Sequence, residues 1–340
     1  MGSSILKQFV CCFLIIIISW EPQALSRMIP DVSMIERHED WMSRYGRQYK
    51  DAAEKERRYN IFKANVKYID FVNNAGNKPY KLAVNEFADL SNDEFKAAHI
   101  GQRNLSKTAK SSTATPLMYE NVTSVPPSID WRKKGAVTPI RDSTCGKSWT
   151  IPAVDAVEGL TKIKTGKLYT LSVQEILDCD GGGHNGCEGG FTDDAFQFIK
   201  QHGLTTESNY PSKGNVGTCD TKKEDEPVAK ISGYENVPVD NENALMQAVA
   251  NQPVAVIVDA SGMDFQFYSS GVFTGDCGTA LDHGVTLVGY GTSNGKLKYW
   301  LIKNSWGVDW GEDGYMRMQR DIAAKEGLCG IAMEAKYPTI

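Results

Sequence analysis

The sequence lacks an excess of positive charge, a membrane-length apolar run beyond its N-terminus, and any CxxC or HxxxH pair of the kind that binds zinc. Its formal net charge is -5, and residues 125–340 contain 20 Lys and Arg against 28 Asp and Glu. A nucleic acid is therefore not an expected partner, because phosphate binding requires a basic surface. The absence of CxxC and HxxxH pairs argues against the common zinc patterns, and we expect no metal and no cofactor.

The longest apolar stretch, Phe9–Trp20, follows Lys7 and precedes the small-residue site Ala24-Leu25-Ser26. At about 12 residues it is shorter than the roughly 20 that a bilayer requires. The pattern is typical of a secretory signal peptide. We therefore expect residues 1–26 to be removed, the chain to reach a vacuole, a lysosome or the extracellular space, and no membrane association afterwards.

Residues 34–74 are charged and poor in glycine, with apolar residues at every third or fourth position. This periodicity predicts two amphipathic helices, broken near Gly46. A short strand is expected at Tyr80–Val84, and Ser91 is the predicted N-cap of a further helix.

Residues 101–127 are rich in Ser, Thr and Lys, and they carry two glycosylation sequons, at Asn104 and Asn121. Such a composition is typical of an exposed linker, where proteolysis concentrates. We expect sugars on both asparagines and a cut near Val125.

After Val125 the sequence becomes rich in glycine, tryptophan and cysteine. Helices are predicted at residues 153–164, 173–177, 193–201 and 242–249, and strands at residues 254–258, 285–290, 299–303 and 315–318. Because helices dominate early and strands late, the pattern predicts an α+β fold with two subdomains and a cleft between them. Six cysteines remain after the signal segment and predict three disulfides, whose pairing the sequence leaves open: Cys145, Cys179, Cys187, Cys219, Cys277 and Cys329.

The run Cys145-Gly146-Lys147-Ser148-Trp149 resembles the C-G-[SA]-C-[WY] signature of papain-like cysteine proteases, with Ser148 in place of the nucleophilic cysteine. The family carries a His and an Asn roughly 130 to 150 residues downstream. His283 and Asn304 follow Ser148 by 135 and 156 residues, within Leu-Asp-His-Gly and Lys-Asn-Ser-Trp-Gly. Residues 54–73 and 83–89 resemble the two prosegment motifs, and the likeness is greatest to plant vacuolar and senescence-type members.

The resemblance implies a papain-like fold, with a helical L subdomain, a β-barrel-like R subdomain and a helical inhibitory prosegment. The domains would be a signal peptide at 1–26, a propeptide at 27–124 and a peptidase domain at 125–340. The implied disulfides are Cys145–Cys187, Cys179–Cys219 and Cys277–Cys329, which leave no cysteine unpaired. The implied substrate-binding residues are Gly189, Gly190, Phe191, Ile257, Leu281, Asp282, Trp306 and Glu334, with Trp306 also shielding the pair of His283 and Asn304.

The chemistry of the site predicts impaired catalysis. The papain mechanism needs a thiolate, and a serine hydroxyl, with its much higher pKa, reacts only with a general base. Asn304 is a neutral amide and does not stabilise the imidazolium that a serine mechanism builds up. Asp142 stands where the family has an oxyanion-hole glutamine, and a carboxylate repels the oxyanion. Pro152 is expected to kink the helix after Ser148.

We therefore expect a pseudoenzyme, a homologue of cysteine endopeptidases without appreciable activity. Its cleft would bind a peptide, a partner protein, a protease inhibitor or its own prosegment, and another protease would have to process it. One alternative is a slow endopeptidase that uses Ser148 with His283 and Asn304. A second alternative is a storage or defence protein without a ligand.

Overall fold

The computed structural model describes residues 34–100, 118–119, 122, 124–142, 147–180, 190–224 and 226–340. Its contacts divide the chain into two compact units, Met1–Tyr68 and Ile69–Ile340. The expected signal peptide lies outside the described residues, as do Asn104, Asn121, Cys145, Cys187 and Gly189. In the described part of the chain, no helix is long and apolar enough to span a bilayer.

The first unit contains a helix over residues 34–44 and the beginning of α3 (Ala52–Asn74). Between them the chain turns at Gly46, whose φ of +60° disfavours any residue with a Cβ. Trp41 and Phe62 are buried with ring centroids 5.4 Å apart, and His38 stacks on Trp41. The predicted pair of amphipathic helices broken near Gly46 is confirmed.

The second unit is built on a nine-stranded sheet. The strands follow one another in the order β1 (Tyr80–Leu82), β5 (Tyr268–Phe273), β8 (Tyr315–Gln319), β7 (Lys298–Lys303), β6 (His283–Thr292), β4 (Val254–Val258), β9 (Ala335–Thr339) and β3 (Gly233–Asn236), and β2 (Ile129–Asp130) pairs with β6. Only β5 and β8 run parallel among these pairs. The expected barrel-like subdomain is an open sheet, since β1 and β3 form its two ends.

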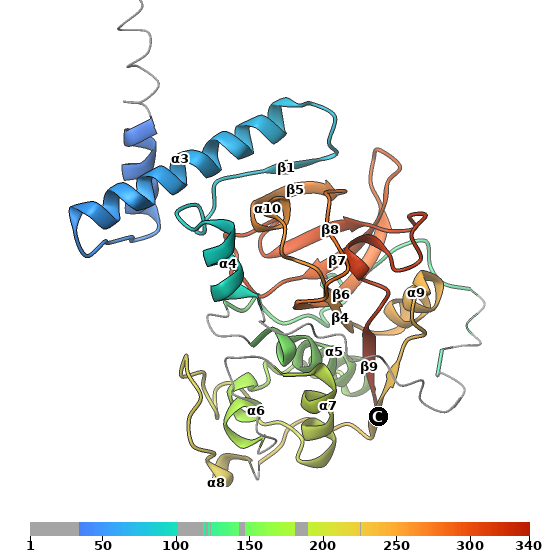
Figure 1. Cartoon of the computed structure of the whole chain (residues 1–340). Helices are drawn as coiled ribbons and strands as arrows, with labels where there is room; N and C mark the ends of the chain where they lie inside the picture. Colours follow the sequence, from blue (N-terminus) through green and yellow to red (C-terminus); the bar gives the residue numbers. More distant parts are fainter. Residues whose placement is uncertain are drawn as a thin grey trace, which may run out of the picture. The chain divides into compact units, whose positions relative to one another are not determined.

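The second unit also contains helices and 3-10 turns. They are α4 (Asn92–His99), the 3-10 turn η1 (Lys147–Trp149), α5 (Ile151–Thr165), α6 (Val173–Cys179), α7 (Thr192–Gln201), α8 (Thr221–Glu224), α9 (Glu242–Asn251), α10 (Met263–Gln266) and the 3-10 turn η3 (Leu328–Gly330). Figure 1 shows α6, α7 and α8 grouped away from the strands, with α5 between them and the sheet. The α+β arrangement expected from the sequence is present.

The helix α5 is buried from Ile151 to Thr161, where it contacts α7, β4, β6 and β9, and its last three residues are exposed. Its close packing requires Gly159, since a Cβ there would lie 2.5 Å from Pro253 Cγ. The helix ends at Gly166, whose left-handed φ of 78° forms the C-cap. Most of the buried apolar residues of α5, α6 and α7 belong to one cluster.

We expected Pro152 to kink this helix, and that prediction is wrong. The helix begins at Ile151, so Pro152 lies in its first turn, where the missing N–H has no intrahelical partner to lose. Ser148 instead lies in η1, before the helix. Because Pro152 has no N–H to donate to the Ser148 carbonyl, the α-helical pattern does not extend back to Ser148.

The predicted element types are confirmed, and their bounds shift by a few residues. The strand β4 has the predicted bounds, Val254–Val258, and β6 begins two residues before the predicted start, at His283. Two of the implied disulfides are present, Cys179–Cys219 and Cys277–Cys329. The third implied pair, Cys145–Cys187, lies outside the described residues.

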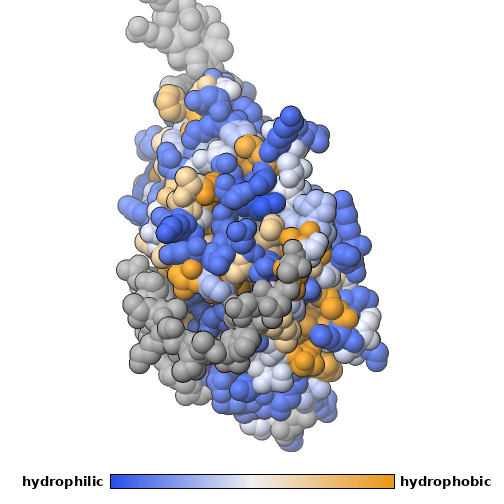
Figure 2. All heavy atoms as spheres, turned by 90° about the vertical axis from the view of Figure 1, so that its right-hand side faces the viewer, coloured by the Kyte–Doolittle hydropathy of each residue, from blue (hydrophilic) through white to orange (hydrophobic). Residues whose placement is uncertain are grey.

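Figure 2 shows the surface on the right-hand side of Figure 1. Hydrophilic residues cover most of this face, with smaller hydrophobic areas scattered among them. Large exposed apolar side chains in the described chain include Phe71 and Val308, which are 74% and 62% exposed. They lie far apart in the sequence and belong to different elements.

Candidate active site

Ser148 is buried, at 5% exposure, and lies directly before α5. Its carbonyl oxygen faces the first residues of β6, because a Cβ placed on Gly284 would lie only 2.0 Å from that oxygen. Glycine is therefore required at position 284 for the two segments to approach. This contact brings Ser148 beside His283, the residue before Gly284, although the two are 135 positions apart in the sequence.

His283 is held by Asn304. Its Nε2 lies 2.8 Å from Asn304 Oδ1, which also accepts a hydrogen bond of 2.8 Å from the Ser305 N–H. Because this oxygen accepts both bonds, Nε2 is the protonated nitrogen of the neutral ring. The other nitrogen, Nδ1, is buried and has no hydrogen-bond partner among the described residues. Ser148 is among those residues, so no hydrogen bond joins Nδ1 to the Ser148 hydroxyl in this structure.

The environment of His283 disfavours its protonation. Burial lowers the pKa of His283 to about 4, although the hydrogen bond to Asn304 acts in the opposite direction. The indole of Trp306 lies over the imidazole with a centroid distance of 4.5 Å, and Trp306 is itself buried. The ring is thus positioned as a base, but as one with little affinity for a proton at neutral pH.

Asp142 borders the same site from the opposite strand. It forms an isolated antiparallel bridge with Trp306, and the Gly307 N–H donates to the Arg141 carbonyl at 3.2 Å. A Cβ on Gly307 would lie 3.8 Å from Asp142 Cγ and 3.6 Å from Glu86 Oε1. Two carboxylates therefore flank Gly307. Glu86 was not among the residues that we expected at the site. Its place within the second prosegment motif was the available signal.

Buried charges tie both sides of the site to α5. Lys303, the neighbour of Asn304, contacts Asp155 at 2.9 Å, and Arg141, the neighbour of Asp142, contacts Glu158 at 2.7 Å. Burial raises the pKa of Glu158, and the Arg141 guanidinium opposes that rise. Because pairs of this kind are costly to break, they hold the two segments in one register.

The residues expected to form the specificity pocket lie together. Ile257 and Leu281 form a small buried apolar cluster, with Phe191 and Met333 packed against it. Met333 was not anticipated, although its position next to Glu334 was a signal. Glu334 Oε1 pairs with Lys336 Nζ at 2.7 Å, and the same ammonium pairs with Asp193 Oδ2 at 3.0 Å, so Glu334 already has a cationic partner that it shares with Asp193.

Gly190 and Asp282 border the same region. A Cβ on Gly190 would lie 2.8 Å from the indole of Trp149, so this glycine packs against the tryptophan that follows Ser148. Asp282 precedes His283, and its carboxylate accepts a hydrogen bond of 2.8 Å from the Ala260 N–H. Burial raises the pKa of Asp282 to about 7 in spite of that bond.

Aromatic residues of the expected prosegment pack against the site. Phe95 of α4 meets Trp306 edge to face at 5.1 Å, and Phe87 does so at 6.0 Å. The helix is fixed by a capping box between Ser91 and Glu94. Because Trp306 covers His283, α4 supports the tryptophan that buries the imidazole. The sequence analysis identified the motif but not this contact.

The described residues bring Cys179, Cys219 and Glu224 within metal-binding distance of one another. The two cysteine sulfurs form a disulfide, so they are not thiolate ligands.

The chain matches two family descriptions, "Papain family cysteine protease" over residues 125–339 and "Cathepsin propeptide inhibitor domain (I29)" over residues 38–95. The senescence-specific cysteine protease SAG12 of Arabidopsis thaliana is 53% identical over 317 residues, which cover 91% of each chain. Vignain of Ricinus communis is 54% identical over 291 residues, which cover 84% of this chain and 80% of vignain.

Solved structures agree with these matches. A recombinant stem bromelain precursor has a TM-score of 0.84 at 44% identity, over 91% of this chain and 99% of its own. The proform of Amb a 11, a ragweed pollen cysteine protease, has a TM-score of 0.84 at 42% identity, over 90% of this chain and 94% of its own. The similarity therefore includes both the prosegment and the part that follows it.

Proposed function

Because the chain belongs to the papain family of cysteine proteases, we propose that it is the precursor of a homologue that binds peptides in a retained cleft and has little or no peptidase activity. The proposed precursor comprises a signal peptide at 1–26, an inhibitory propeptide at 27–124 and a peptidase-like domain at 125–340. The proposed location is the vacuole or the extracellular space, reached through the secretory pathway.

One observation carries the proposal. The position of the family's nucleophile holds the hydroxyl of Ser148, and the neighbouring base is His283, whose pKa burial lowers to about 4. A cysteine in this family reacts as a thiolate, whereas a serine must transfer its proton to the imidazole during attack. A weak base with a neutral amide behind it provides little driving force for that transfer. Asp142 adds a negative charge near the developing oxyanion.

The retained cleft is supported by the residues that surround the site. Phe191, Ile257, Leu281 and Met333 pack together as an apolar group. Because Glu334 is paired with Lys336, we propose that this subsite accepts an apolar side chain in preference to a basic one. Gly190 remains as the proposed backbone-docking edge for an extended peptide.

The slow endopeptidase is the second candidate, favoured by the His283–Asn304 hydrogen bond of 2.8 Å. In it, Ser148 Oγ attacks the peptide carbonyl and passes its proton to His283 Nδ1. The imidazolium then protonates the leaving amine, and water hydrolyses the acyl ester. Two observations weigh against this candidate: His283 Nδ1 has no hydrogen-bond partner among the described residues, and burial lowers the pKa of His283 to about 4.

The test is peptide binding measured together with cleavage. The full chain is cut near Val125 by an added protease, the prosegment is removed, and a labelled extended peptide with an apolar specificity residue is added. We expect a rise in fluorescence anisotropy with the peptide intact by mass spectrometry, and weaker binding by Ile257→Lys. Cleavage that disappears in Ser148→Ala would support the endopeptidase instead. If the protein neither binds nor cleaves the peptide, the proposed peptide-binding cleft is wrong.

A further inference from the structure

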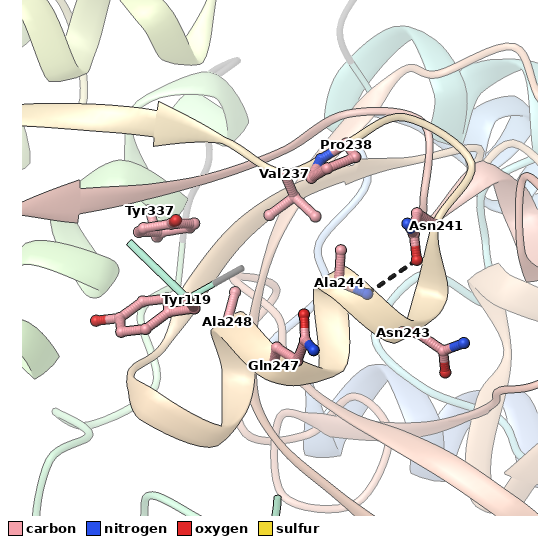
Figure 3. Close-up of a pocket in the computed structure, with 9 residues that line it drawn as sticks. All are labelled: Tyr119, Val237, Pro238, Asn241, Asn243, Ala244, Gln247, Ala248 and Tyr337. Atoms are coloured by element: carbon pink, nitrogen blue, oxygen red, sulfur yellow. Dashed lines mark hydrogen bonds between the residues drawn. The ribbon is translucent and has the colours of Figure 1, made fainter. Parts of the chain in front are cut away.

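A segment of the linker lies on the peptidase domain, on a surface made by β3, α9 and β9. Figure 3 shows the pocket beside it, with Tyr119 of the linker next to Tyr337 of β9 and to Ala248 of α9. The cavity has a volume of about 330 Å³. Its lining comprises Tyr119, Val237, Pro238, Ala244, Gln247 and Tyr337, among others.

The side chain of Tyr119 makes two contacts there. Its ring centroid lies 5.1 Å from that of Tyr337, and its hydroxyl accepts a hydrogen bond of 3.2 Å from Gln252 Nε2. Gln252 is fully buried, and its Oε1 has no hydrogen-bond partner among the described residues. A buried amide directed at the linker is a specific recognition element rather than part of a smooth surface. Burial raises the pKa of Tyr119, consistent with an enclosed hydroxyl.

The linker backbone is recognised on both sides of Tyr119. The Met118 N–H donates to Glu235 Oε2 at 2.9 Å, and Gln247 Nε2 donates to the Val122 carbonyl at 2.9 Å. The hydroxyl of Tyr337 donates to the same Glu235 oxygen and so orients it. The surface thus offers the Glu235 carboxylate as an acceptor for the backbone before Tyr119. It offers the Tyr337 ring and the Gln252 amide to Tyr119 itself, and the Gln247 amide as a donor to the backbone three residues later.

We infer that this surface is a second docking site of the peptidase domain, separate from the cleft at Ser148. Its occupant in the precursor is the chain's own linker, which binds through Met118, Tyr119 and Val122 and is anchored by Tyr119. The surface uses β3 and β9, at one end of the sheet, whereas Ser148 and His283 lie at η1 and the start of β6. The anchor ends three residues before Val125. It therefore holds the chain just before the expected processing bond against the domain.

Hydrogen exchange on the full precursor tests the anchor without relying on the sequence preference of a protease. In the wild type we expect protection of the Met118 amide. Tyr119→Ala should accelerate exchange over residues 118–125 by about tenfold, since it removes the ring contact and a hydrogen bond. Tyr119→Phe, which keeps the ring, should accelerate it by about threefold.

Gln247→Ala tests the same anchor from the domain side and leaves the linker sequence unchanged. We expect about threefold faster exchange over residues 118–125, and faster cutting of the linker by an added protease. Ser124→Ala is the matched control, because Ser124 is exposed, and it should change neither rate. Free-peptide exchange rates in the wild type, or rates unaltered by both Tyr119→Ala and Gln247→Ala, would overturn the inference.

Discussion

His283 and Asn304 form a hydrogen-bonded pair, and the proposed loss of activity rests on Ser148 being a poorer nucleophile than a cysteine. The hydrogen bond to Asn304 assigns the proton to Nε2 and leaves Nδ1 as the acceptor. In a cysteine protease the same orientation suits an ion pair of thiolate and imidazolium. With Ser148 the proton must move during the attack, and the buried ring accepts it poorly.

Restoring sulfur alone is expected to give only weak peptidase activity. In Ser148→Cys the nucleophile returns, but Asp142 still places a carboxylate near the oxyanion. Adding Asp142→Gln should raise kcat/KM by about 10²- to 10³-fold over the single variant, the usual value of one oxyanion-hole donor. Ser148→Ala with Asp142→Gln is the control and should be inactive. If the kcat/KM of Ser148→Cys alone equals that of bromelain assayed alongside, Asp142 does not impair catalysis.

The buried His283 makes the folded chain sensitive to acid. With a folded pKa of about 4 against an ordinary 6.5, the unfolded chain takes up the proton first as the pH falls. The stabilising contribution is complete above about pH 6.5 and is lost as the pH falls towards about 4. Between about pH 7 and about pH 5 the wild type should lose about 2 kcal/mol more unfolding free energy than His283→Gln, measured by urea denaturation. Equal losses in the two proteins would mean that His283 titrates normally.

At the level of elements, α4 packs against the site and follows directly after the second prosegment motif at residues 83–89. Phe95 is fully buried against Trp306, and the capping box at Ser91 fixes the start of the helix. The aromatic cluster continues to Phe265 and Trp310. The docking of this helix therefore depends on aromatic packing over His283.

Phe95→Ala is predicted to destabilise the folded precursor by about 3 to 5 kcal/mol, because it leaves a cavity beside Trp306. The matched control is Phe71→Ala in α3, where the side chain is 74% exposed and the change should be within about 0.5 kcal/mol. Both are measured by chemical denaturation, with intrinsic tryptophan fluorescence as the signal. Similar effects from the two substitutions would contradict the packing described for α4.

The types and order of the elements could be predicted because local patterns agree with the fold. The apolar run at Val254–Val258 became β4 with the predicted bounds, and Ser91 became the N-cap of α4. The start of α5 could not be predicted, since it depends on Pro152 together with the approach of Gly284 to the Ser148 carbonyl. Such a contact joins residues that are distant in sequence, and no local pattern encodes it.

Some residues of the site could likewise be predicted from the sequence, and others could not. Ser148, His283 and Asn304 could be found because they lie in recognisable motifs. Glu86 and Met333 could not, because their roles arise from tertiary packing near Gly307 and Leu281. The low proton affinity of His283 also required the structure, since burial causes it.

For the whole molecule, the account predicts a precursor that does not mature by itself. The catalytic position lacks a thiol, and the linker is anchored on β3, α9 and β9. Incubation of the purified full chain at about pH 4 to 7 should leave it intact, since no charge state of Ser148 or His283 supplies an active nucleophile. An added protease should cut near Val125. Spontaneous conversion that is first order, independent of protein concentration, and absent in Ser148→Ala would refute this prediction.

With an oxygen at position 148, the processed protein is expected to have no useful peptidase activity. This is tested by kcat/KM of the processed protein on a fluorogenic extended peptide, for the wild type and Ser148→Ala prepared in parallel. We expect the two to have equal rates at the level of the buffer blank. A wild-type rate comparable to that of bromelain, abolished in Ser148→Ala, would contradict it.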